Sequence, residues 1–130
     1  MSPDKLDEKW VQFLTERHLA TLTTLRADGS PHVVPVGFTY DLATKRVRII
    51  TFSPSQKVAN ALRGGRAAVS QVDGGRWLTL EGTVSATNDP VIAREACEAY
   101  ARRYREPKVR EDRWVIEIAV DRVLGRVANS

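Results

Sequence analysis

The residues best suited to chemistry form a short polar segment at positions 53–57, directly after an apolar run at positions 49–52. The β-branched run predicts the end of a buried strand, and the polar segment predicts the start of a helix. Ser53 is of a type favoured at the N-cap, Pro54 suits the first helical position, and Gln56 completes a capping box with Ser53. We therefore expect a strand-to-helix junction here.

The first turn of this helix has the composition of an anion-binding site. Its backbone N–H groups have no partner within the helix, the helix dipole is positive there, and Lys57 adds an ammonium group. Ser55 and Gln56 add polar side chains, and Asn60 lies on the same helical face one turn later. These residues predict a phosphate site. The alternative is an ordinary capped helix with a solvated lysine, and both stay open at this point.

The other titratable side chains indicate no metal site and no single catalytic residue. His18 and His32 lack the spacing of metal ligands and an accompanying cysteine or carboxylate cluster, so we predict no metal. His18 is expected to be a helix-end residue that contacts terminal carbonyl groups. His32, Tyr40 and Glu81 are the available proton donors, and the sequence does not choose among them. The catalytic residues are therefore left unassigned.

Basic residues are concentrated at positions 102–113, which read RRYREPKVREDR. This segment is either a solvated loop or a cationic rim that meets the carboxylates of a substrate. The chain has 20 Lys and Arg residues against 16 Asp and Glu residues, a net charge of +4. Because the basic residues lack the interleaved aromatic residues of an RNA-binding segment, we expect an anionic small molecule and no nucleic-acid partner.

The length and composition are those of one soluble domain. A chain of 130 residues, 42% hydrophobic and 28% charged, is expected to form a single domain over residues 1–130. No apolar run reaches the ~20 residues that cross a bilayer, so we expect neither a membrane segment nor a signal peptide. The one cysteine, Cys97, excludes an internal disulfide and favours a cytoplasmic location.

Short strands dominate the rest of the pattern. Ser2 and Pro3 are expected to begin a first helix, Asp28-Gly29 predicts a hairpin turn, and Gly82 predicts a bulge. The predicted strands are residues 19–25, 32–40, 45–52, 67–72, 77–86, 114–120 and 122–127, and the last helix is capped by residues 88–90. This order predicts a mainly β (α+β) fold, a six- to seven-stranded antiparallel split β-barrel with peripheral helices.

Two blocks of the sequence carry a family resemblance. They are LATLTTLRADGSPHVVPVGFTYD at positions 19–41 and RVRIITFSPSQKVANALRGGRAAVSQVDGGRWLTLEG at positions 46–82. They resemble the pyridoxamine 5'-phosphate oxidase-like proteins, or FMN-binding split barrels. Within these they are similar to the actinobacterial flavin/deazaflavin oxidoreductases that use coenzyme F420, especially the mycobacterial biliverdin reductase group. The likeness runs from about Leu14 to Gly125.

The resemblance implies a homodimer with a cofactor in each of two grooves at the interface. It implies that the cofactor phosphate lies at Ser55, Gln56 and Lys57, with Asn60 beside them. It also implies that Thr51 lies near the ribityl chain, that Pro35, Val36 and Gly37 face the ring, and that Gln71, Arg76 and Trp77 close the groove. A strand with proline and glycine agrees with this, because it offers a ring a flat, approachable backbone.

The resemblance also implies an activity. Reduced F420 would transfer a hydride to a small conjugated acceptor, and with biliverdin the hydride would reach the central methine bridge and form bilirubin. Positioning and exclusion of water would then supply most of the rate enhancement. Two alternatives stay open: an FMN-dependent oxidoreductase of the same fold, and a non-catalytic protein that binds F420.

Overall fold

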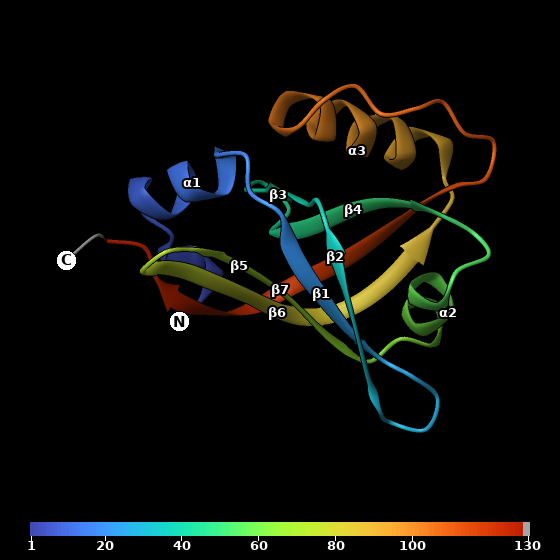
Figure 1. Ribbon diagram of the computed structural model, residues 1–130, viewed down its shortest axis with the longest axis horizontal. Coiled ribbons are helices and arrows are strands. Elements are labelled where there is room, and N and C mark those ends of the chain that lie inside the picture. The colour runs from blue at the N-terminus through green and yellow to red at the C-terminus, as the bar shows by residue number, and fades with distance from the viewer. Residues whose placement is uncertain (129–130) are drawn as a thin grey trace.

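A computed structural model describes residues 1–128 of the chain and contains one seven-stranded sheet with helices around it (Figure 1). The strands are β1 (Ala20–Leu25), β2 (Pro31–Val36), β3 (Thr39–Asp41), β4 (Arg46–Phe52), β5 (Arg66–Asp73), β6 (Arg76–Thr87) and β7 (Arg113–Arg126). The helices are α1 (Glu8–Thr15), α2 (Gln56–Arg63) and α3 (Pro90–Arg103), and a 3-10 turn (Pro3–Lys5) precedes them.

The sheet curls into an open barrel. Its strand order is β2-β1-β5-β6-β7-β4-β3, and the paired strands are antiparallel. β2 and β3 are consecutive in the chain but stand at opposite ends of this order, so the chain crosses the open seam between them. The predicted six- to seven-stranded antiparallel split barrel with peripheral helices is confirmed.

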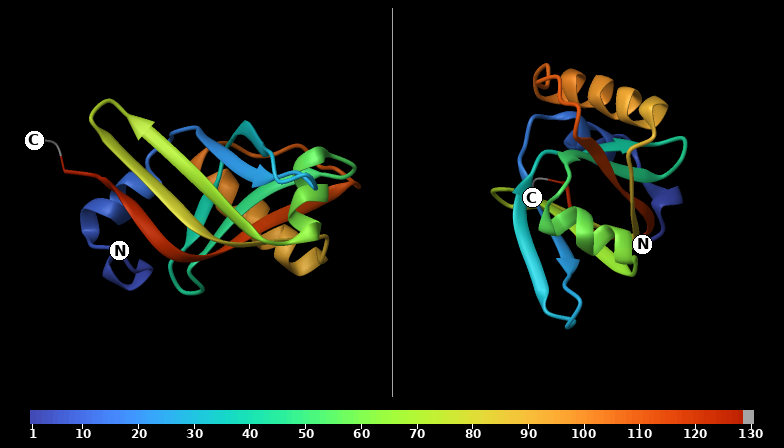
Figure 2. Two further views of the ribbon diagram at one scale, coloured as in Figure 1. Left: turned by 90° about the horizontal axis from the view of Figure 1, so that it is seen from below. Right: turned by 90° about the vertical axis from the view of Figure 1, so that its right-hand side faces the viewer.

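The helices cover different parts of the barrel (Figures 1 and 2). α1 and α2 lie towards opposite ends, whereas α3 packs along the outside against β3, β4 and β7. The side chains of Phe13, Leu22, Phe38 and Ile49 are fully or almost fully buried in the core that these elements enclose. Burial of each such side chain contributes roughly 1.5–3 kcal/mol relative to exposure. No helix within residues 1–128 has the length and apolar character needed to cross a bilayer.

The predicted continuous strand over residues 32–40 is wrong. β2 ends at Val36 and β3 begins at Thr39, so Gly37 and Phe38 lie between them without strand structure. The reason is tertiary, because β2 must pair with β1 while β3 must pair with β4 across the seam. The backbone has to leave one ladder before it enters the other.

The predicted N-cap of the central helix is also wrong. The cap of α2 is Ser55, whose hydroxyl accepts a hydrogen bond from the Val58 N–H at 3.3 Å. Ser53 instead continues the β4–β7 pairing, where its N–H donates to the Asp112 carbonyl at 3.1 Å, so the cap falls two residues later. Gln56 is consequently the first helical residue and not the partner of a capping box.

Two further boundaries differ from the prediction. Ser2 caps only the 3-10 turn, and α1 has its own cap in Asp7, whose carboxylate accepts two backbone N–H bonds. The two strands predicted near the C-terminus are one strand, β7, because β6 pairs with it throughout. The pairing register of β6 and β7 shifts between Glu81 and Gly82, where β7 has one residue more than β6. This shift confirms the predicted bulge.

Candidate functional site

A groove of about 490 Å³ opens between the ends of β2 and β4 and the segment that follows α3. Its volume lies within the range of small-molecule sites, roughly 300–1,000 Å³. The groove is lined by Pro35, Val36, Gly37, Ile49, Ile50, Thr51, Phe52, Lys57, Tyr100, Arg105, Glu106, Pro107, Lys108, Arg110 and Arg113. The position follows from the topology, because β2 borders the open seam, where its outer edge has no strand partner among residues 1–128.

Five residues predicted to contact a cofactor line this groove together. Pro35 and Val36 come from the end of β2, and Gly37 directly follows it. Thr51 comes from the end of β4, and Lys57 from the first turn of α2. They are separated in sequence, and the fold alone brings them to one place. The groove is therefore the candidate cofactor site, and contact of these residues with a cofactor stays a prediction.

Three other predicted residues hold α2 in place. Ser55 is its cap, and Asn60, only 1% exposed, accepts a hydrogen bond from Gln56 Nε2 at 2.7 Å. The Asn60 amide also donates to Thr24 Oγ1 of β1 at 3.0 Å. These bonds fix the orientation of the first turn and so the direction of Lys57. Direct contact of the three with a cofactor stays a prediction.

The last three predicted residues, Gln71, Arg76 and Trp77, do not line the groove of their own chain. Gln71 is fully buried and donates to the Phe13 carbonyl at 2.9 Å. Trp77 is 39% exposed on β6. The resemblance implies that these residues close a cofactor groove, and this groove would have to belong to a second subunit. This role stays a prediction.

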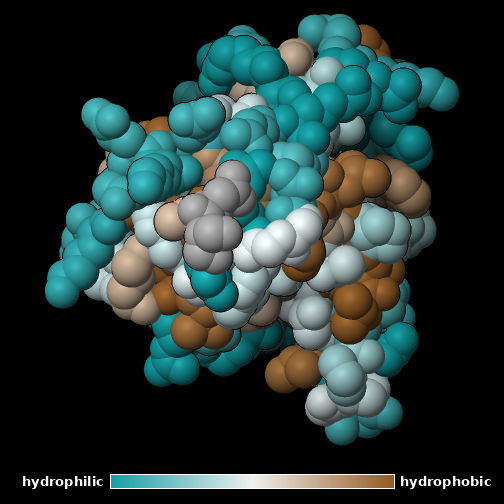
Figure 3. Space-filling view, turned by 60° about the vertical axis from the view of Figure 1, so that its left-hand side comes forward, coloured by the Kyte–Doolittle hydropathy of each residue, from teal (hydrophilic) through white to brown (hydrophobic). Residues whose placement is uncertain are grey.

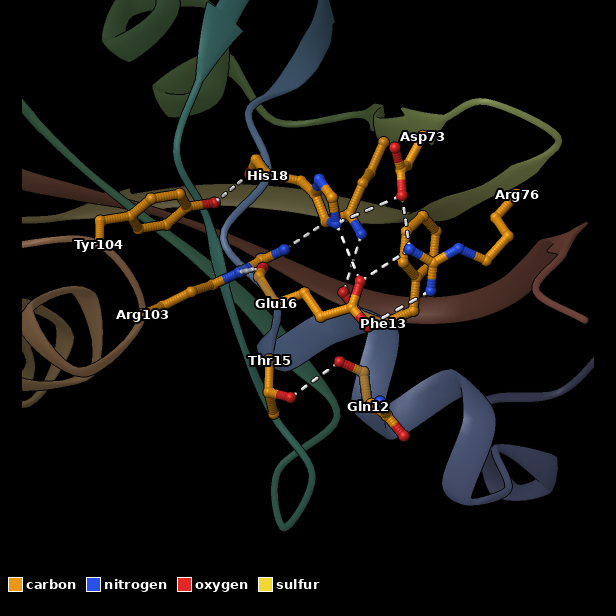
Figure 4. A network of polar contacts seen from close by, with 10 residues as sticks. Gln12, Phe13, Thr15, Glu16, His18, Asp73, Arg76, Arg103 and Tyr104 are labelled. Carbon is orange, nitrogen blue, oxygen red and sulfur yellow. Dashed lines mark hydrogen bonds and ion pairs between the residues drawn. The ribbon is translucent and has the colours of Figure 1, made fainter. Parts of the chain in front are cut away.

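Arg76 joins the end of α1 to the β5–β6 hairpin (Figure 4). Its guanidinium nitrogen lies 2.8 Å from a Glu16 oxygen and 2.5 Å from an Asp73 oxygen. Hydrogen bonds from Arg76 and then His18 lower the pKa of Glu16 to about 2. His18 Nε2 lies 3.0 Å from the Glu16 carboxylate, so His18 contacts a side chain and not the terminal carbonyls that we expected.

The same network gives His18 the carboxylate neighbours that its sequence spacing does not reveal. Ligand atoms of Glu16, His18 and Asp73 converge within 4.8 Å. Arg76 already forms an ion pair with both carboxylates. We therefore interpret the cluster as an ion-pair network that fastens α1 to the sheet.

Basic side chains give the groove a positive character. Lys57 Nζ lies 5.5 Å from the centre of the Phe52 ring, and the Arg110 guanidinium lies 4.3 Å from it. Arg110 pairs with Asp112, whereas Arg113 donates to backbone carbonyls, those of Thr51 and Lys108. The run at positions 102–113, which the sequence left as either loop or rim, thus contributes Arg105, Lys108, Arg110 and Arg113 to the groove.

Partial burial of the Lys57 ammonium group favours the binding of an anion beside it. Partial burial lowers the pKa of Lys57, because the ammonium group loses hydration. An anionic group placed nearby would stabilise the charged form of Lys57 and gain a charge-assisted hydrogen bond. The arrangement therefore favours a ligand with phosphate or carboxylate groups.

Thr51 provides an unsatisfied polar atom beside the groove. The residue is 4% exposed, and its Oγ1 has no hydrogen-bond partner within residues 1–128. Buried hydroxyl groups nearly always have a partner in the protein, in water or in a ligand. This position is consequently suited to a hydroxyl-bearing or otherwise polar ligand.

The three candidate proton donors are not among the groove-lining residues. His32 Nδ1 and Tyr40 Oη are buried without a partner within residues 1–128, and burial raises the pKa of Tyr40. Glu81 faces Arg122, with 3.9 Å between the charged atoms. Tyr100 lines the groove but was not predicted as a site residue. Its spacing on the apolar face of α3 is that of a core residue.

Comparisons with known proteins show the family of the chain. The pyridoxamine 5'-phosphate oxidase family profile matches residues 6–126. An F420H2-dependent biliverdin reductase from Mycobacterium tuberculosis is 54% identical over 121 residues, which are 93% of this chain and 88% of that protein.

Solved structures share the fold at lower identity. A conserved hypothetical protein from Mycobacterium tuberculosis superposes with a TM-score of 0.77 at 20% identity, over 92% of this chain and 84% of that one. A protein described as an F420 reductase superposes with a TM-score of 0.73 at 24% identity, over 92% and 98% of the two chains. With the profile match over most of its length, the chain belongs to the pyridoxamine 5'-phosphate oxidase family.

Proposed function

We propose that this protein is an F420H2-dependent oxidoreductase that reduces a conjugated acceptor, with biliverdin as the substrate and bilirubin as the product. The observation that carries the proposal is the 54% identity to a relative named for this activity. The groove supports the proposal, because it is lined by basic residues and by the backbone at positions 35–37, and its volume is that of a small-molecule site.

The residues of the groove fit the chemical groups of F420. Lys57 at the helix N-terminus suits the phosphate, and the basic residues of the 105–113 segment suit the acidic tail or the two propionates of a linear tetrapyrrole. The backbone at positions 35–37 offers a flat wall for the ring, and the unpaired hydroxyl of Thr51 suits the polyol chain. Glu106 is the one acidic residue that lines the groove within residues 1–128, and five basic residues outweigh its charge.

The chain's own contribution is then mainly one of positioning. Bound F420H2 would supply the hydride, and the one proton that completes the reduction to bilirubin would come from solvent. Lys57 orients the phosphate end, residues 35–37 hold the ring edge, and Tyr100 with the 105–113 segment encloses the acceptor and excludes water. Hydrogen bonds from the strand backbone to the edge of the F420 ring would change how readily the reduced ring donates a hydride.

The direct test is to mix the purified protein with biliverdin and chemically reduced F420 without oxygen. We expect bilirubin to form in step with oxidised F420, one molecule for each, as followed by their separate absorbance bands. A parallel reaction with reduced FMN and binding titrations of F420 and FMN complete the experiment.

Each alternative has its own outcome in this experiment. Tight F420 binding without turnover of biliverdin or of a panel of conjugated acceptors would identify a non-catalytic F420-binding protein. Tight FMN binding without F420 binding would identify an FMN-dependent enzyme of the same fold. Turnover of another acceptor but not of biliverdin would retain the cofactor and replace the substrate.

We also propose that the protein is a homodimer with the cofactor groove at the interface. The outer face of the sheet carries exposed apolar side chains on adjacent strands, among them Leu25, Val33, Val72, Trp77 and Leu124. Figure 3 shows hydrophobic side chains gathered on the surface above the tip of the β1–β2 hairpin. Pro35 belongs to this outer face and also lines the groove, so a second copy on this face would border the groove.

Light scattering on the purified protein should therefore give the mass of two chains. Val33→Arg should give the mass of one chain, because a charge on the 56%-exposed Val33 would be buried without a partner in the dimer. The matched control is Val91→Arg, at a 50%-exposed position on α3, which should stay dimeric. A single-chain mass for the unmodified protein would contradict the proposal.

A further inference from the structure

Two residues at the end of α3, Arg103 and Tyr104, form hydrogen bonds with the crossover between β2 and β3, which consists of residues 37–38. The Phe38 N–H donates to Tyr104 Oη at 3.2 Å, and the Phe38 carbonyl accepts from Arg103 Nη1 at 2.7 Å. The Tyr104 hydroxyl in turn donates to the His18 carbonyl at 2.6 Å (Figure 4). Because Phe38 lies between the two strands and is fully buried, these side chains satisfy backbone groups that have no sheet partner.

Arg103 is a buried cation that joins three segments. It is 8% exposed, and besides Phe38 it donates to the Glu16 carbonyl at 2.8 Å and to Gln71 Oε1 at 2.5 Å. Its guanidinium also lies 4.7 Å from the centre of the Phe38 ring. Its three acceptors are two backbone carbonyls and one amide oxygen, and burial lowers the pKa of Arg103. A planar fork with several fixed donors suits this joint better than a flexible ammonium group.

The glycine before Phe38 brings the same helix end against the groove wall. A Cβ at Gly37 would lie 3.0 Å from Tyr100 Cε2 and 3.2 Å from the Tyr104 ring, so a side chain there would push these rings back by a few tenths of an ångström. The rings of Tyr100 and Tyr104 are 4.9 Å apart and back the crossover together. Gly37 and Tyr100 both line the groove. The backbone of residues 37–38 therefore lies between the groove and the side chains of Arg103 and Tyr104.

We propose that Arg103 and Tyr104 are positioning residues of the cofactor groove, acting through the backbone of residues 37–38. The proposal rests on the proposed function, because it takes this backbone as the wall that receives the ring of F420. Without the two side chains, the Phe38 N–H and carbonyl lose their partners and the wall is free to shift. Small displacements of a binding wall have large effects on binding and rate, because the interactions need fixed geometry.

The test compares Tyr104→Phe with a control of similar effect on stability. Tyr104→Phe keeps the ring and removes only the hydroxyl that contacts Phe38 and His18. The control, Val123→Ala, removes part of a buried side chain on β7 that does not line the groove. The dissociation constant for F420 is measured by titration of its fluorescence, and deuterium uptake is measured for peptides that cover residues 36–39.

For Tyr104→Phe we expect faster deuterium uptake at residues 36–39 and an F420 dissociation constant about tenfold higher, the consequence of one lost hydrogen bond in the wall. Val123→Ala should lower the thermal midpoint without either change. Arg103→Lys keeps the charge but loses the fork, and we expect it to raise the dissociation constant as well.

Two outcomes separate the proposals. If the unmodified protein binds F420 and Tyr104→Phe binds it equally well, or if uptake at residues 36–39 does not change, Arg103 and Tyr104 are structural residues only. If the unmodified protein does not bind F420, the proposed function is wrong, while faster uptake in Tyr104→Phe would still show that the hydroxyl holds the crossover.

Discussion

Lys57→Ala is expected to raise the dissociation constant for F420 by about 10- to 100-fold, the loss of one charge-assisted hydrogen bond of roughly 1.5–3 kcal/mol. Lys57 is the cation at the first turn of α2, beside Phe52, and partial desolvation lowers its pKa. Its folded-state partner is an aromatic ring, so the free energy of unfolding should fall by less than about 1 kcal/mol. Fluorescence titration and urea unfolding measure the two quantities.

Two variants control for charge alone. Lys57→Arg keeps the cation and should retain most of the affinity. Lys5→Ala removes the same charge from the exposed 3-10 turn and should bind F420 like the unmodified protein. Equal dissociation constants for Lys57→Ala and Lys5→Ala would place the phosphate elsewhere in the groove.

The second large effect concerns the bulge between β6 and β7. A Cβ at Gly82 would lie 1.9 Å from the Ala119 carbonyl oxygen and 2.6 Å from its carbon, both backbone atoms. The clash cannot be relieved by a side-chain rotation, because a whole strand would have to move. Gly82→Ala should therefore lower the free energy of unfolding by about 3 kcal/mol or more, a large part of the 5–15 kcal/mol typical of a domain.

Gly75→Ala is the matched control for this variant. Gly75 lies in the turn between β5 and β6, and a Cβ there would meet no atom within 4 Å beyond its chain neighbours. We expect its urea midpoint to stay close to that of the unmodified protein, within about 0.5 kcal/mol in free energy. If Gly82→Ala unfolded at the same urea concentration as Gly75→Ala, the close approach of β6 and β7 at this bulge would be wrong.

Local signals were sufficient for much of the fold. The Asp28-Gly29 turn is present, with Gly29 at a φ of +85°, and the bulge occurs at Gly82 as predicted. The turn follows from the freedom of glycine to adopt a positive φ, whereas glycine at the bulge also allows the close approach of the Ala119 backbone on β7. Lys57 and the Pro35–Gly37 backbone likewise stand out in the sequence, because a cation near a helix N-terminus and a proline with a glycine in one strand are unusual locally.

Other features depend on partners far away in the sequence. Ser55 and not Ser53 is the cap, because the pairing of β4 with β7 extends to Ser53, whose N–H donates to the Asp112 carbonyl. Arg103 looked like one more charge in a basic run, yet it is buried because three separate segments supply acceptors for it. No window of local sequence contains these partners.

Residue patterns alone were enough to predict the class of the barrel, the turns and bulge that shape it, and the residue types of an anion-binding helix start. The folded chain was needed to establish where the helix begins, where the strand at positions 32–40 breaks, and which basic residues meet in one groove. The physical reason is the range of the forces involved. Turn and cap preferences act over a few residues, whereas strand pairing and burial join β2, β4 and the 105–113 segment only after the sheet has curled.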